Sequence, residues 1–253
     1  MSWITPDWPA SRNVRALMTT RRGGVSTGPY GSTPDDREGM NVGLASGDDV
    51  AVVASNRARL RAVLPAEPRW LTQIHGALVV DAAQVDSSVK AVADASFTDA
   101  AGVVCVVSVA DCMPVFLADV SGRCVGVAHA GWRGVAAGVI QATAQAMRRR
   151  LENPNAELLA YLGPAIGPQH FEVGAEVLDA MLLRLPDAAT AFKEQPHGKY
   201  LADLFTLGRQ ALDHAGVGCI YGGRDCTYSD PALFYSYRRE RPTGRHAALI
   251  WLV

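Results

Sequence analysis

The chain has 253 residues, of which 49% are hydrophobic, so it is long and apolar enough to bury a large core. Its 24 basic and 25 acidic residues give a net charge of -1, which provides no electrostatic reason to expect nucleic acid or an acidic membrane as a partner. The start, MSWITPDWPASR, does not follow the pattern of a secretory signal, and the longest apolar run, 101–110, is about half the length that spans a bilayer.

The first half of the chain combines a long loop, a helix and short strands. Residues 26–40 are rich in Gly, Pro and Asp, which indicates a loop that is longer than a simple connection needs. Residues 48–64 predict a helix, because an aspartate near its start is followed by apolar residues at helical spacing. Strands are expected at residues 77–83, 102–110, 114–119 and 123–130.

The second half alternates helices with further strands. A helix over 134–151 should end in three arginines, which suit a helix C-terminus. A buried strand is predicted at 157–166, helices at 174–185 and 203–216, and two strands in the tail, joined by a turn at 242–244. Strands and helices are interleaved, many connections are short and nothing marks a boundary. We therefore predict one α/β domain, residues 1–253, with layers and a mixed sheet.

The cysteines carry the first chemical signal. Their number, five, is odd and includes no CxxC pair, so we expect a reducing, cytoplasmic compartment without a disulfide framework. Cys112 and His129 lie at nearly equal distances along the chain from Ser121, in the tight turn between two predicted strands. They should face each other or be one position off, with Cβ atoms about 4.5–5.5 Å apart. Pro114 cannot donate to a strand ladder, so Cys112 should lie at the sheet rim.

The residues alone leave three interpretations of this pair open. Both side chains can be core residues, a nucleophile with its base, or two ligands of one metal ion. His129 precedes AGWRG, a strand-to-helix turn where free amides can meet an anion. His75, beside Gly76 at the start of a strand, would complete a His₂Cys set, a composition of catalytic zinc sites that leaves a fourth position open. The spacing permits this convergence without requiring it.

A series of motifs occurs in the order typical of one family. They include TTRRGGVSTGPY, NVGLASGDD, TQIHG, ADASFT, VADCMPV, AHAGWRG, LGPAIGPQHFEVG, DCTYS and FYSYRRERPTGRHAALIWL. The chain therefore resembles the YfiH-like family, long labelled multicopper polyphenol oxidase or laccase-like and now described as purine nucleoside phosphorylase. The resemblance runs from residue 17 to the end, and the pairing of ADC with HAGWRG is highly specific. The stretch 31–40 is longer than the corresponding loop usually is.

The resemblance carries expectations about fold, metal and reaction. It implies a single-domain, four-layer α/β/β/α sandwich and a metal held by His75, Cys112 and His129, normally zinc, with copper as the alternative. It also implies phosphorolysis of inosine, guanosine, adenosine and methylthioadenosine to free base and ribose 1-phosphate, with adenosine deaminase activity besides. The partners would be purine nucleosides and phosphate, and we expect a monomer or a small homo-oligomer.

This chemistry suggests roles for five further residues. Asp111, next to Cys112, is a candidate to move a proton or orient a ligand, and equally a candidate cap of a strand end. Arg21, Arg57 and Arg133 are candidates for holding phosphate, each with an ordinary surface or salt-bridge role as the alternative. Asn41 is a candidate hydrogen-bonding partner of the nucleoside.

Other classes of function also fit part of the pattern. His₂Cys with nearby Met113 resembles a blue-copper centre, although six histidines are too few for the additional copper cluster of a conventional laccase. A metal-free Cys–His hydrolase or amidase, editing peptidoglycan precursors, would use Cys112 as nucleophile. A binding module without catalysis leaves the Cys and two His at strand rims unexplained. Spectroscopy of copper-loaded protein tests the copper centre. Metal analysis tests the hydrolase, because a thiolate bound to zinc is a ligand and not a free nucleophile.

Overall fold

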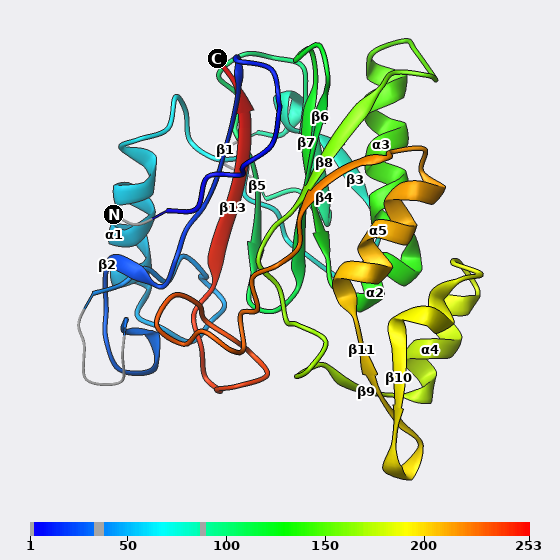
Figure 1. Ribbon diagram of the computed structural model, residues 1–253. Coiled ribbons are helices and arrows are strands. Elements are labelled where there is room, and N and C mark those ends of the chain that lie inside the picture. The colour runs from blue at the N-terminus through cyan, green and yellow to red at the C-terminus, as the bar shows by residue number, and fades with distance from the viewer. Residues whose placement is uncertain (1–2, 33–37, 87–89) are drawn as a thin grey trace.

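The computed structural model describes residues 3–32, 38–86 and 90–253, which form four stacked layers (Figure 1). Two β-sheets pack face to face in the middle of the molecule, and helices cover the outer face of each. This α/β/β/α arrangement is the predicted fold class, and its larger sheet is mixed. Residues 33–37 of the long loop 31–40 lie outside the described residues.

The larger sheet has six strands, in the spatial order β12 (Cys219–Gly222), β8 (Leu158–Leu162), β6 (Met113–Asp119), β7 (Val125–Ala130), β4 (Ala95–Thr98) and β3 (Val79–Asp81). The central hairpin of β6 and β7 is the one predicted from the sequence, and β8 and β4 pair antiparallel on either side of it. The outer strands β12 and β3 run parallel to their neighbours, which makes the sheet mixed.

The smaller sheet is antiparallel and has three strands, in the order β1 (Val14–Met18), β13 (His246–Leu252) and β5 (Cys105–Val109). The strand from the end of the described chain, β13, is thus its centre (Figure 1). A separate three-stranded sheet is formed by β10 (Phe192–Gln195), β11 (Lys199–Ala202) and β9 (Glu172–Gly174), and β2 (Arg22–Ser26) lies near the first helix.

The described residues contain five α-helices, which are α1 (Val50–Arg61), α2 (Trp132–Ala137), α3 (Val139–Arg150), α4 (Ala175–Leu182) and α5 (Leu204–His214). Two begin at an aspartate whose side chain accepts hydrogen bonds from the first free backbone amides, Asp49 for α1 and Asp203 for α5. Such a cap stabilises a helix by about 0.5–2 kcal/mol, which explains why the starts of both helices were predictable.

Three apolar clusters fill the spaces between the four layers. Alternate residues of β6 divide between them: Val115 and Leu117 face α3 and α5, whereas Phe116 faces the smaller sheet. The third cluster joins the smaller sheet to α1 through Leu60. Each fully buried side chain of this size contributes about 1.5–3 kcal/mol, so the register of the central hairpin is strongly fixed.

The predicted helix 134–151 is wrong as a single element. The chain instead forms α2 and α3, separated by Gly138 in a left-handed conformation with φ +89°. A residue in this conformation ends one helix and lets the next begin in a new direction. The six-residue α2 is also too short to act as the anion-binding helix start that AGWRG suggested.

The tail contains one strand instead of the two predicted. Residues 232–239 form turns and irregular chain, and some of their backbone amides donate to side chains instead of to a strand ladder. The Tyr235 amide donates to His246 Nε2 at 2.8 Å, and the Arg238 amide donates to Asp111 Oδ2 at 2.7 Å. These two hydrogen bonds attach the segment to the start of β13 and to the loop that carries Cys112.

Candidate metal centre and its cavity

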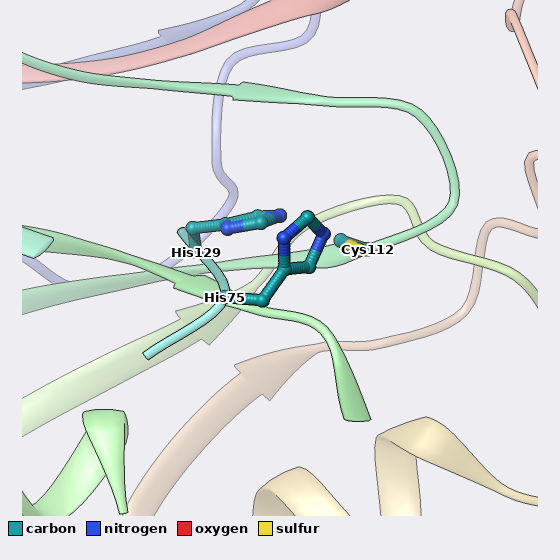
Figure 2. A group of neighbouring side chains, drawn as sticks. All are labelled: His75, Cys112 and His129. Carbon is teal, nitrogen blue, oxygen red and sulfur yellow. The ribbon is translucent and has the colours of Figure 1, made fainter. Parts of the chain in front are cut away.

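His75, Cys112 and His129 converge at one end of the central hairpin (Figure 2). One donor atom from each lies within 4.8 Å of the others, and the two imidazole rings meet edge to face with centroids 4.8 Å apart. His129 is buried, Cys112 is half-buried and His75 is exposed. We refer to these three residues as the His₂Cys group.

The strand pairing that brings Cys112 close to His129 differs from the predicted pairing. The ladder pairs Met113 with Ala130 and Pro114 with His129, so Cys112 lies just before β6 and diagonal to His129. The shift arises because the turn centres between Ser121 and Gly122 and not on Ser121, since the last pair before it joins Ala118 to Val125. Diagonal residues share a sheet face, so both side chains still extend from the same side.

Asp94, which the sequence analysis did not single out, holds the two histidines in place. Its buried carboxylate accepts hydrogen bonds from three successive backbone amides, Ile74 at 3.2 Å, His75 at 2.9 Å and Gly76 at 2.7 Å. The same group lies 2.9 Å from His129 Nδ1. The carboxylate therefore stabilises the left-handed backbone of His75, with φ +60°, and directs the other imidazole.

The contact with Asp94 selects the nitrogen of His129 that faces the site. Because Nδ1 is hydrogen-bonded to the carboxylate, Nε2 is the ring nitrogen that can bind a metal ion, as in carboxylate–histidine–metal arrangements. Burial alone would raise the pKa of Asp94, but hydrogen bonds from His129, Gly76 and Ile74 hold it below its ordinary value. The acid is therefore a fixed negative charge behind the imidazole.

Cys112 has the electrostatics of a thiolate. Burial alone would raise the pKa of its thiol, but the positive charge of His129 and hydrogen bonds from both imidazoles lower it below the ordinary value. Conversely, the charges of Cys112 and Asp94 raise the pKa of His129 although burial opposes this. A thiolate with two imidazoles is a donor set that suits zinc, with one position left for water or substrate.

Gly131 leaves room for the sulfur, which yields a testable pair of substitutions. A Cβ atom at Gly131 would lie 2.6 Å from Cys112 Sγ, whereas one at Gly76 would meet nothing closer than 3.6 Å. We expect Gly131→Ala to displace the thiolate and weaken zinc binding by about 10-fold or more, while Gly76→Ala retains wild-type affinity. Competition with a chromophoric chelator measures both affinities, and equal values for the two variants would contradict this geometry.

Asp111 is directed to the tail segment. Its Oδ1 accepts from Thr227 Oγ1 at 2.6 Å, and its Oδ2 accepts from Ser236 Oγ at 3.0 Å and from the Arg238 amide at 2.7 Å. Its backbone is also left-handed, with φ +79°. This conformation turns the chain immediately before Cys112, so these bonds anchor the residue that precedes the thiolate.

The His₂Cys group lies in the wall of a cavity of about 690 Å³. Arg57 and Arg133, both singled out in the sequence, line this cavity, and so do Lys90 and Arg245, which were not. A second cavity of about 730 Å³ lies against α3 and is lined by none of the three donors. Nothing local in the sequence distinguishes Arg245 from its arginine neighbours, because its place depends on the smaller sheet.

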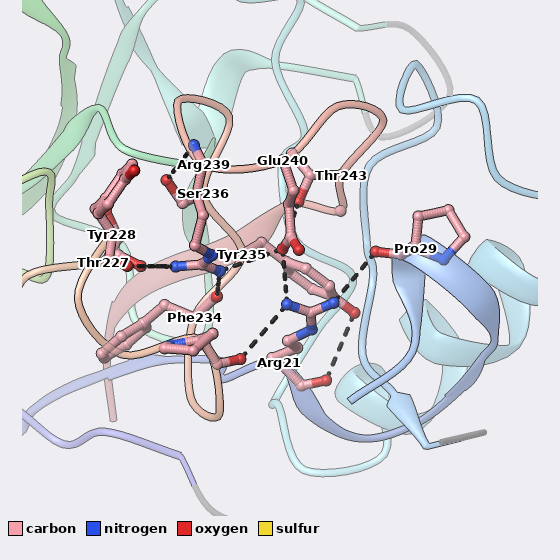
Figure 3. Close-up of polar contacts among 12 residues, drawn as sticks. Arg21, Pro29, Thr227, Tyr228, Phe234, Tyr235, Ser236, Arg239, Glu240 and Thr243 are labelled. Atoms are coloured by element: carbon pink, nitrogen blue, oxygen red, sulfur yellow. Dashed lines mark hydrogen bonds and ion pairs between the residues drawn. The ribbon is translucent and has the colours of Figure 1, made fainter. Parts of the chain in front are cut away.

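Asn41 and Arg21 lie behind the cavity and do not line it. Asn41 is buried, its Nδ2 donates to Ser46 and Asp48, and its Oδ1 accepts from two backbone amides, so it shapes the loop that forms one wall. Arg21 is 2% exposed and pairs with Glu240 at 2.7 Å, and it also donates to backbone carbonyls (Figure 3). A phosphate contact for Arg21 is thus wrong, because its charge is neutralised inside the protein.

The described residues include all six histidines and all five cysteines, yet they form only one group of three or more metal-type donors, the His₂Cys group. A multicopper cluster built from histidines would need a second such group in this same part of the chain. No helix in the described residues combines the length and the apolar character that crossing a bilayer requires.

The fold and the site define a class, a four-layer α/β protein with a His₂Cys group at the end of its central hairpin. The chain belongs to the family described as multi-copper polyphenol oxidoreductase laccase, whose model matches residues 15–253. This family corresponds to the YfiH-like resemblance seen in the sequence, which is thereby confirmed.

Several relatives cover nearly the whole chain. A protein of Pseudomonas aeruginosa named purine nucleoside phosphorylase is 47% identical, over 99% of this chain and 98% of its own length. The Escherichia coli purine nucleoside phosphorylase YfiH is 45% identical over the same shares. A crystal structure of the Neisseria meningitidis protein NMB0706 has a TM-score of 0.91 at 46% identity and covers 100% of this chain and 99% of that one. YlmD from Geobacillus stearothermophilus gives 0.89 at 33% identity, over 100% and 96%.

Proposed function

We propose that this protein is a zinc-dependent purine nucleoside phosphorylase. The observation that supports this most is the placement of the His₂Cys group in one cavity with four cationic side chains and, among its described lining residues, no acidic one. Such a cavity suits an anionic co-substrate beside a metal. The names of the relatives from Pseudomonas aeruginosa and Escherichia coli agree with this activity.

The proposed reaction joins a purine nucleoside with phosphate. A phosphate oxygen forms a bond to the ribose anomeric carbon, the bond from that carbon to the purine nitrogen breaks, and its electron pair leaves with the base, which takes up a proton. The products are ribose 1-phosphate and the free base. We propose inosine, guanosine, adenosine and methylthioadenosine as substrates, and hydrolytic deamination of adenosine as a second activity of the same site.

The residues present fit a zinc ion. Two imidazole nitrogens and a thiolate converge, Asp94 directs one imidazole, and the absence of a side chain at Gly131 leaves room for the sulfur. When bound, zinc would supply Lewis-acid activation at its open position. The family description names copper, for which the same three donors would be ligands.

The chain's own side chains have distinct proposed tasks. Arg57 and Arg133 contact the two substrates from the cavity wall, and the positive charge of Arg57 balances the negative charge of phosphate. Asp111 positions the Cys112 loop through its bonds to the tail, and Asn41 supports the wall from behind. We place the protein in the cytoplasm, where nucleosides and phosphate meet.

Turnover of inosine and adenosine with and without phosphate tests this proposal. We expect hypoxanthine and ribose 1-phosphate from inosine only when phosphate is present, and ammonia from adenosine without phosphate. Elemental analysis of the same preparation should give about one zinc per chain. Base release that is independent of phosphate would show a hydrolase instead, and oxidation of phenols by copper-loaded protein would favour a polyphenol oxidase.

A further inference from the structure

The four cations that line the cavity of the His₂Cys group differ in how deeply they are buried. Arg57 and Arg245 are partly buried, whereas Arg133 is exposed and stacks on Trp132 with its Cζ 4.3 Å from the ring centroid. None of the four lining cations forms an ion pair with a carboxylate in the described part of the chain. Buried positive charge without a counter-charge is costly, so its accumulation in one wall needs an explanation.

Arg57 is held rigidly with part of its guanidinium free. Its Cζ lies 3.7 Å from the centroid of the Trp70 ring, and its Nε donates to the Val42 carbonyl at 2.9 Å. These two contacts fix the plane of the group, while both Nη nitrogens have no protein acceptor among the described residues. Burial lowers the pKa of Arg57 to about 10, so it remains charged at neutral pH. Glu67 lies nearby but contacts Arg61 at 4.0 Å.

Arg245 reaches the same short segment from the smaller sheet. The Val42 amide donates to the Arg245 carbonyl at 3.1 Å, and a Cβ atom at Gly43 would lie 2.6 Å from Arg245 Cγ. Gly43 therefore permits the arginine side chain to pass close to the backbone that also anchors Arg57. The Nη1 of Arg245 donates to two carbonyls of its own loop, which again fixes the guanidinium.

Lys90 is the third cation of this arrangement. It lines the same cavity, and partial burial and the positive charge of Arg57 lower its pKa. The two cations are thus close enough to repel each other. We call Arg57, Lys90 and Arg245 the cationic wall. Two guanidinium groups held in place and a lysine that is repelled by one of them line the same cavity, and an anion with more than one negative charge would stabilise all three.

We infer that the cationic wall is an oxyanion subsite that binds inorganic phosphate beside the His₂Cys group. The choice of ligand rests on the proposed function, whereas the subsite rests on the geometry. Two guanidinium forks and an ammonium match a tetrahedral dianion, because forks pair with two oxygens and an ammonium acts as a point charge. Arg133 is exposed and is not part of the cationic wall. It therefore remains available to contact the nucleoside.

Kinetics with single-alanine variants of the holoenzyme test the subsite. We expect Arg57→Ala and Arg245→Ala to raise the KM for phosphate roughly 10- to 100-fold, and Lys90→Ala to raise it less, with the KM for inosine within about twofold. Arg57→Lys keeps the charge but loses the fork, so its KM should lie between those of wild type and alanine. Arg59→Ala, an exposed arginine of the same helix outside the cavity, is the matched control and should behave as wild type.

A binding measurement makes the result independent of turnover. Inorganic phosphate, added at constant ionic strength, should raise the melting temperature of the wild type and of Arg59→Ala, but not that of Arg57→Ala. If the protein binds phosphate in this way but releases no base, the subsite stands and the proposed function fails. If phosphorolysis occurs and the alanine variants retain the wild-type KM for phosphate, the proposed function stands and the subsite is wrong.

The source of the phosphate group is tested in the same experiment. A nucleoside 5′-monophosphate carries the same tetrahedral dianion, so adenosine 5′-monophosphate serves as the second probe. Stabilisation by inorganic phosphate that depends on Arg57 supports the assignment. Stabilisation by the nucleotide alone would overturn it, because the wall would then hold a phosphate ester of the substrate.

Discussion

Replacing Cys112 with alanine is expected to empty the metal site and to lower kcat/KM for inosine phosphorolysis by about 10³-fold. The thiolate is the only anionic donor of the His₂Cys group, and two neutral imidazoles alone hold zinc weakly. Zinc content, measured by elemental analysis after dialysis, should fall from about one per chain to a small fraction. Cys112→Ser keeps the size of the side chain but not the soft donor and should behave similarly.

A matched control keeps this result specific. Cys219 is an exposed free thiol on β12 that does not line the cavity, so Cys219→Ala should retain zinc and activity. Thermal unfolding of metal-free wild type and Cys112→Ala should be similar, because Cys112 is only half-buried. Loss of activity with full zinc content would make Cys112 a nucleophile and reject its role as a ligand. Wild-type activity in Cys112→Ala would reject both roles.

Asp94→Asn is expected to have the second largest effect, on both metal affinity and folding. One carboxylate oxygen accepts from the His75 amide and contacts His129, and the other accepts from Ile74 and Gly76. The side-chain amide of asparagine has only one acceptor oxygen. Whichever way this amide is oriented, the two contacts made by the other carboxylate oxygen are lost. Zinc affinity should fall about 10- to 100-fold, and the free energy of unfolding of the metal-free protein by about 2–4 kcal/mol.

The stability difference should depend on pH in a defined direction. The pKa of Asp94 is lower in the folded protein than its ordinary value of 3.8, so the ionised carboxylate favours folding. This contribution is fully present above that value and is lost as the pH falls through the lowered pKa of the folded state. Denaturant unfolding should therefore separate wild type from Asp94→Asn by a constant amount near neutral pH and by less in acid.

Another buried carboxylate serves as the control for Asp94. Asp119 lies at the opposite end of β6 and accepts from the backbone and the guanidinium of Arg123. Asp119→Asn should cost stability without weakening zinc binding, because it is remote from the His₂Cys group. Equal zinc affinities for the Asp94 and Asp119 variants would remove the positioning role assigned to Asp94.

The parts of the fold that the sequence predicts well are those with strong local signals. Asp49 and Asp203 cap their helices through their own nearest amides, and the apolar runs of β6 and β7 are joined by a tight turn. Gly138 interrupts a helical pattern that otherwise continues unbroken, and a glycine inside such a pattern is often tolerated. Its left-handed conformation follows from tertiary packing, including Arg184 beside it, which no local pattern shows.

The site was predictable in its donors but not in its supports. Cys112 and His129 share a hairpin, so their approach follows from local pairing even though the register was shifted. The position of His75 depends on a hydrogen bond to Asp94. No sequence pattern links the two segments that carry these residues. Among the arginines, Arg21 is neutralised by Glu240 whereas Arg245 is unpaired in the described residues. Only the folded arrangement distinguishes them, because residue type and spacing are similar.

The central place of β13 has a consequence for how the protein is made. Its two neighbours, β1 and β5, precede it in the chain and are therefore synthesised long before it. Until β13 leaves the ribosome, β1 and β5 each lack the partner to which their backbone groups bond in the finished sheet. Unpaired strand edges of this kind favour association between nascent chains. Newly made molecules should thus depend on chaperones until β13 has been synthesised, although all three donors of the His₂Cys group are synthesised before it.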